Sequence, residues 1–169
     1  MAAAESENLV LGLGNILLKD DGIGVRLVRE LQKKGIPPGV SCLEGGTALL
    51  DIPGFLGRKT RLLVVDALRG GGKPGTVYML SEADFTRGEG GGMPLTSLHD
   101  LRILGLLQMP DMARWIKSWK IMGVEPQEIG PGCQLTPLLQ SKLPYLTDRL
   151  CEEAKRMTAG VRLESFTYF

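Results

Sequence analysis

Short apolar runs alternate along this chain with segments that have the spacing of amphipathic helices. Five runs have the length and composition of buried strands, at residues 9–14, 40–43, 61–67, 76–80 and 119–124. Helical spacing lies between several of these runs and after the last one, at residues 24–33, 48–56, 98–116 and 137–157. Because the two patterns alternate, we predict an α/β fold: a three-layer sandwich in which helices flank a five-stranded, twisted, mostly parallel sheet.

The connection between the third and fourth predicted strands is short. It reads GGGKPG at residues 70–75, which is typical of a turn and leaves no room for a crossover helix. We therefore predict that these two strands form a hairpin, which makes residues 76–80 the one antiparallel strand of the sheet.

Length and charge narrow the class of protein. The 169 residues fit a single domain over residues 1–169, with residues 1–8 and 158–169 as peripheral tails. Twenty Lys and Arg against 19 Asp and Glu give a net charge of +1, so we expect neither nucleic acid nor an anionic membrane as partner.

No run approaches the ~20 apolar residues of a membrane helix, and the start of the chain does not resemble a secretory signal. With only three cysteines and no C-x-x-C pair, we expect a cytoplasmic protein.

Three side chains with metal-binding or acid–base chemistry follow predicted elements. Asp21 lies between the first strand and the first helix, Asp66 ends the third strand, and His99, the only histidine, follows a glycine-rich segment at 85–96 that we expect to be mobile. Ligands of open α/β sheets bind beyond the carboxyl ends of the strands. Two carboxylates and an imidazole would leave open positions on a divalent metal, and they suit nickel or zinc better than magnesium or calcium. Each also has an ordinary structural explanation, such as capping of the first helix by Asp20 or Asp21.

Dinucleotide binding is a competing explanation for the glycines of the first loop. Gly12 and Gly14 follow a strand and precede a helix, but the third glycine of a G-x-G-x-x-G motif is replaced by Leu17. Asp20 and Asp21 would also repel the pyrophosphate that a helix N-terminus attracts. The chain has neither a P-loop nor the G-x-S-x-G elbow of serine hydrolases. Nucleotide binding is therefore the weaker hypothesis.

Residues 12–24, GLGNILLKDDGIG, resemble the opening signature of the nickel–iron hydrogenase maturation endopeptidases, G-x-G-N-x-L-x-x-D-(D/E)-x-x-G. Shorter matches follow in the order of that family: GGT at 45–47, VDA at 65–67, PG at 74–75, SLH at 97–99 and MGVEP at 122–126. The resemblance covers about residues 9–150.

This resemblance implies a phosphorylase/hydrolase-like fold and a cytoplasmic endopeptidase, of aspartic or metal-assisted type. The enzyme would remove the C-terminal extension of a hydrogenase large-subunit precursor after nickel insertion. The resemblance also implies that Asp21, Asp66 and His99 line a catalytic metal site that probes nickel held by the precursor. The nickel would arrive with the substrate, so we expect no tightly bound cofactor, although zinc or cadmium could substitute.

Two other functions are compatible with the same residues. A non-catalytic chaperone that checks nickel during hydrogenase assembly would use the same trio without cleaving a peptide bond. A flavodoxin-like small-molecule binding module would instead bind a nucleotide or flavin.

Overall fold

The computed structural model describes residues 7–48, 51–57, 60–86 and 102–162 of the chain. The strands are β1 (Asn8–Leu13), β2 (Ser41–Gly46), β3 (Thr60–Ala67), β4 (Val77–Ser81) and β5 (Ile116–Val124). The α-helices are α1 (Ile23–Lys34), α2 (Ile52–Phe55), α3 (Glu82–Thr86), α5 (Arg102–Leu107) and α6 (Pro137–Arg162). The described residues also include the 3-10 helices η1 (Asp20–Gly22) and η3 (Pro110–Arg114).

The five strands form one sheet in the order β2-β1-β3-β5-β4. β2, β1, β3 and β5 are parallel, and β4 pairs with β5 in the antiparallel direction at one edge. This confirms the predicted α/β class and its mixed, mostly parallel sheet. The antiparallel direction of the fourth strand is also confirmed.

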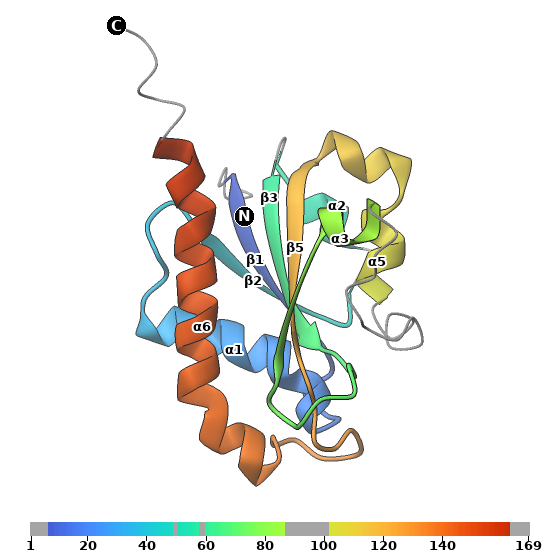
Figure 1. Cartoon of the computed structure of the whole chain (residues 1–169), viewed down its shortest axis with the longest axis vertical. Coiled ribbons are helices and arrows are strands. Elements are labelled where there is room, and N and C mark those ends of the chain that lie inside the picture. Colours follow the sequence, from blue (N-terminus) through green and yellow to red (C-terminus); the bar gives the residue numbers. More distant parts are fainter. Residues whose placement is uncertain (1–6, 49–50, 58–59, 87–101, 163–169) are drawn as a thin grey trace, which may run out of the picture.

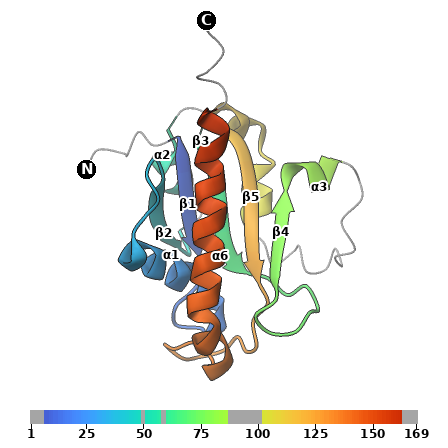
Figure 2. The ribbon, with the colours of Figure 1, turned by 60° about the vertical axis from the view of Figure 1, so that its left-hand side comes forward.

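The predicted hairpin between the third and fourth strands is wrong, because β5 lies between β3 and β4 (Figure 2). The connection from β3 passes the carboxyl end of β5 before it enters β4. Two backbone hydrogen bonds hold it there. The amide of Leu68 donates to the carbonyl of Val124, and the amide of Glu125 donates to the carbonyl of Thr76, both at 2.9 Å. β5 begins at Ile116, three residues before the start that its apolar run predicted. The last four positions of β5, residues 121–124, are all buried, as expected for a strand with a neighbour on each side, whereas β4 is half-buried throughout and occupies the edge.

Helices cover both faces of the sheet, as Figures 1 and 2 show. The strand residues divide between the two faces by simple alternation. Val10, Leu63 and Val65 pack in the core beneath α1 and α6, together with Ile23, Leu27, Leu31, Leu139, Leu146 and Leu150. Leu9, Leu11, Leu62 and Val64 pack on the opposite face, together with Ile52, Ile103, Leu104, Leu107 and Met112. None of the helices in the described ranges is long and apolar enough to cross a membrane.

Two glycines let α1 lie directly against the sheet backbone. A Cβ atom on Gly24 would lie 2.1 Å from the carbonyl oxygen of Val65 and 2.4 Å from that of Leu13. A Cβ atom on Gly12 would lie 2.5 Å from the carbonyl oxygen of Gly24. No real side chain fits at such distances, so these glycines serve the contact between helix and strand. That packing role accounts for both residues without a bound dinucleotide.

We expect Gly24→Ala to destabilise the protein by about 3 kcal/mol, the upper end of the usual cost of overpacking, because the methyl group meets backbone on both sides. The matched control is Gly105→Ala in α5, where a Cβ atom has no neighbour within 4 Å. Since alanine favours helix, the control should be neutral or stabilising by up to about 1 kcal/mol. Urea unfolding of the two variants measures the difference, and equal stabilities would contradict the close approach of α1 to the sheet.

Candidate active site

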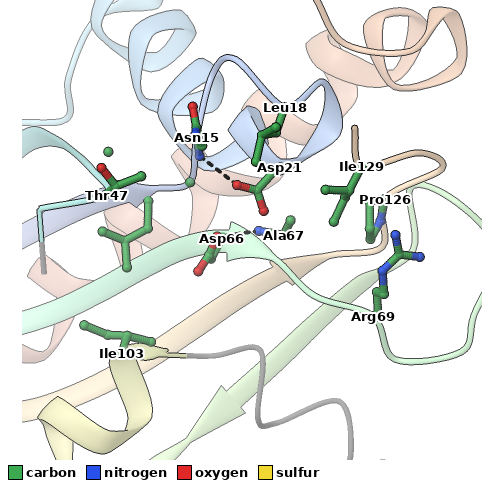
Figure 3. A pocket seen from close by; sticks show the side chains of 13 residues that line it. Asn15, Leu18, Asp21, Thr47, Asp66, Ala67, Arg69, Ile103, Pro126 and Ile129 are labelled. Atoms are coloured by element: carbon green, nitrogen blue, oxygen red, sulfur yellow. Dashed lines mark hydrogen bonds between the residues drawn. The ribbon is translucent and has the colours of Figure 1, made fainter. Parts of the chain in front are cut away.

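A pocket of about 590 Å³ opens beyond the carboxyl ends of β1, β2 and β3 (Figure 3). This is the edge of the sheet where the fold class predicts a ligand. The residues that line the pocket are Leu13, Gly14, Asn15, Leu18, Asp21, Gly46, Thr47, Asp66, Ala67, Arg69, Ile103, Pro126 and Ile129. Among them, Asp21, Asp66 and Arg69 carry the charged side chains.

Asp21 is held in the pocket by the turn that follows β1. Gly14 has a φ of +116°, and a Cβ atom there would lie 1.9 Å from the carbonyl oxygen of Asp21, so the turn requires glycine. The Asn15 side chain accepts a hydrogen bond from the amide of Leu17 at 2.9 Å, which stabilises the turn. The backbone N–H of Asn15 donates to the Asp21 carboxylate at 2.8 Å. The Gly-Asn pair of the opening motif therefore positions a carboxylate.

Asp66 reaches the same pocket from the end of β3. The four residues before it are buried in the sheet, whereas Asp66 itself is half-buried. Its carboxylate accepts a hydrogen bond from the amide of Ala67 at 2.8 Å. Figure 3 shows the side chains of Asp21 and Asp66 in one part of the pocket, one from η1 and the other from β3. Two carboxylates in one cavity create a negative potential that attracts a cation.

His99, the third predicted site residue, lies outside the described residues, as does most of the glycine-rich segment at 85–96. Within the described ranges, no three side chains of His, Cys, Asp or Glu come together as a metal-binding group. The structure thus brings together two of the three predicted residues, and the participation of His99 stays a prediction.

Asp20 has a different role from the helix cap that its position suggested. Its side chain makes no capping contact with η1 or α1, and it is fully buried. Its carboxylate accepts hydrogen bonds from the amides of Gln127, Glu128 and Thr136 at 2.9, 3.0 and 2.8 Å, and from the Thr136 hydroxyl. Asp20 therefore joins the loop after β1 to the segment that precedes α6. Adjacent aspartates thus point to different places, Asp20 into the protein and Asp21 into the pocket.

A buried glutamate holds the segment that follows Asp66, and sequence reasoning missed it. Glu125 is only 6% exposed and accepts hydrogen bonds from the amide of Gly70 at 2.6 Å and from the Tyr78 hydroxyl at 2.8 Å. Burial, and then this hydrogen bond, raise the pKa of the Tyr78 hydroxyl above its ordinary value. No local pattern indicates this role, because the partners of Glu125 lie 47 and 55 residues away.

Thiol chemistry plays no part in the described pocket. No cysteine is among the residues that line it. All three cysteines are free, and burial raises the pKa of the Cys42 thiol to about 11, so that this group stays protonated at neutral pH. Carboxylates are therefore the acid–base groups that the described pocket offers.

Comparisons with known proteins identify the family of the chain. The family model of hydrogenase maturation proteases matches residues 25–153. The chain is 33% identical to the hydrogenase 2 maturation protease of Escherichia coli K12 over 142 residues, which are 80% of this chain and 82% of that protein. It is 30% identical over 154 residues to the hydrogenase expression/formation protein HupD of Bradyrhizobium diazoefficiens, covering 89% of this chain and 79% of that protein.

Solved structures show the same fold. The hydrogenase-maturating endopeptidase HybD of Escherichia coli superposes with a TM-score of 0.69 at 28% identity, over 89% of this chain and 93% of that one. The solution structure of an endopeptidase from Escherichia coli gives a TM-score of 0.72 at 30% identity with the same coverage.

Proposed function

Because the chain belongs to the hydrogenase maturation protease family, it is an endopeptidase of hydrogenase maturation, and we propose that Asp21, Asp66 and His99 recognise nickel in its substrate. The substrate is the hydrogenase large-subunit precursor, whose C-terminal extension the enzyme removes. Nickel reaches the pocket as part of this precursor and is not a resident cofactor of the enzyme.

The observation that carries this proposal is that Asp21 and Asp66 line one pocket at the carboxyl edge of the sheet. Carboxylate oxygens are ligands that a divalent cation accepts, and two of them leave coordination positions for the ligands that the precursor supplies. A precursor without nickel would present no cation to these carboxylates. The pocket can therefore distinguish loaded from empty precursor by charge alone.

The same two side chains can perform the proton transfers of peptide hydrolysis. A carboxylate accepts a proton from the attacking water as the carbon–oxygen bond forms, and it returns the proton to the leaving amine as the carbon–nitrogen bond breaks. Binding of the nickel would hold the scissile peptide bond next to this base, so that the reacting groups are already positioned when the reaction begins. Recognition and cleavage thus use one pair of carboxylates.

The test is incubation of the protein with nickel-loaded and nickel-free precursor, followed by intact mass spectrometry. We expect the loaded precursor to be shortened by a C-terminal peptide and the empty precursor to keep its full mass. Binding of loaded precursor without any change in mass would indicate a nickel-checking chaperone instead. Equal cleavage of both precursors would contradict recognition of nickel.

A further inference from the structure

We propose that Arg69 is a specificity-determining residue that binds an acidic side chain of the substrate segment crossing the pocket. The inference rests on the proposed function and adds a second contact to it. The two carboxylates would hold the cationic part of the substrate, and Arg69 would hold an anionic part. The pair of contacts would fix the direction in which the peptide lies.

The pocket carries negative charge in one place and positive charge in another. Asp21 and Asp66 lie together, whereas Figure 3 shows Arg69 beside Pro126, apart from both carboxylates. Arg69 is exposed, and in the described part of the chain its guanidinium forms no hydrogen bond or ion pair. A permanent positive charge that lines a substrate pocket without a partner is available to an incoming anion.

The backbone that carries Arg69 is fixed on both sides. The amide of Leu68, the residue before it, donates to the carbonyl of Val124 at 2.9 Å. The amide of Gly70, the residue after it, donates to the buried carboxylate of Glu125 at 2.6 Å. Arg69 therefore extends from a defined point at the pocket wall, and only its side chain must become ordered when it binds a ligand.

The chemistry of the guanidinium favours a carboxylate over a peptide carbonyl. A carboxylate accepts two parallel hydrogen bonds from the guanidinium fork, and both are strengthened by opposite charges. Every peptide presents carbonyl groups, whereas an acidic side chain at one position distinguishes one sequence from another. Arg69 would therefore select the substrate as well as bind it.

The experiment is steady-state processing of nickel-loaded precursor by Arg69→Ala, Arg69→Lys and Arg69→Glu variants. We expect Arg69→Ala to lower kcat/KM by on the order of 10- to 100-fold, mainly by raising KM, and Arg69→Lys to retain part of the wild-type value. Because the contact is exposed, added salt should weaken processing by wild type more than by Arg69→Ala. Arg114→Ala, which removes another exposed arginine on η3, is the matched control and should leave KM unchanged.

Charge exchange identifies the partner. Each acidic residue near the cleavage point of the precursor is changed in turn to lysine, and one of these precursors should be processed faster by Arg69→Glu than by wild type. An unchanged KM for Arg69→Ala, or the absence of any rescued pair, would overturn the role of Arg69 while normal wild-type cleavage keeps the proposed function intact. Failure of the wild-type protein to cleave loaded precursor would overturn both. Melting temperatures of all variants identify any loss of activity that comes from unfolding.

Discussion

Asp66→Asn should lower the rate of precursor processing by about 100-fold or more, because a general base contributes at least that much to the rate. The melting temperature should stay unchanged or rise. Asparagine keeps the size of the side chain and an oxygen that can accept the 2.8 Å hydrogen bond from the amide of Ala67. It removes the negative charge that attracts a cation and the basic oxygen that accepts a proton. Asp21→Asn should have the same effect, because the amide of Asn15 can still donate to the remaining oxygen.

The control for both variants is Asp111→Asn, which removes an exposed carboxylate on η3 and should process precursor at the wild-type rate. Intact mass against time gives the rates, and thermal melting reports the fold. Normal processing by both Asp21→Asn and Asp66→Asn would show that the active site has been assigned to the wrong residues.

Asp20→Asn should produce the opposite pattern, a large loss of stability. The fully buried Asp20 carboxylate accepts hydrogen bonds from three amides and one hydroxyl, and an asparagine side chain has a single acceptor oxygen. The NH₂ group of the asparagine would face N–H donors, which would then lack an acceptor in the protein interior. We expect a loss of about 3 kcal/mol, as for other substitutions that leave buried polar groups without partners.

Urea unfolding of Asp20→Asn and Asp21→Asn compares one chemical change at neighbouring positions. If Asp20 only capped a helix, asparagine would replace it at almost no cost, since the two residues cap about equally well. A loss below about 0.5 kcal/mol for Asp20→Asn would therefore support the capping role and contradict the structural one. Equal losses for the two variants would contradict the division of roles between the adjacent aspartates.

The sequence was informative wherever structure depends on neighbours along the chain. Apolar runs located the strands, and helical spacing located α1 and α6. The rule that ligands lie beyond strand ends indicated the edge where β3 ends at Asp66, and the pocket does open there. The helix predicted at 48–56 is much shorter in the described residues, where α2 spans Ile52–Phe55 and includes Pro53 near its start. A proline is accommodated best in the first turn of a helix, which is where Pro53 lies.

The features that sequence reasoning missed depend on partners far away in the chain. Asp20 is of a residue type that commonly caps helices, but its hydrogen-bond partners lie 107 to 116 residues away in the sequence. β4 follows β3 in the sequence, yet it pairs with β5, whose residues come later. Glu125 ends an apolar run like many exposed carboxylates, and only the fold shows that it is buried against the segment after Asp66.

Asp21 and Asp66 are proposed to bind the nickel that the precursor carries. The most direct measurement is nickel K-edge X-ray absorption of the loaded precursor, recorded alone, in frozen stoichiometric complex with wild-type protein, and with the Asp21→Asn/Asp66→Asn double variant. The cleaved subunit provides the reference for any change that follows from cleavage itself. We predict additional light-atom ligands to nickel in the wild-type complex and the spectrum of free precursor with the double variant. A wild-type complex whose spectrum matches free precursor, or a double variant that changes the spectrum as wild type does, would contradict the claim.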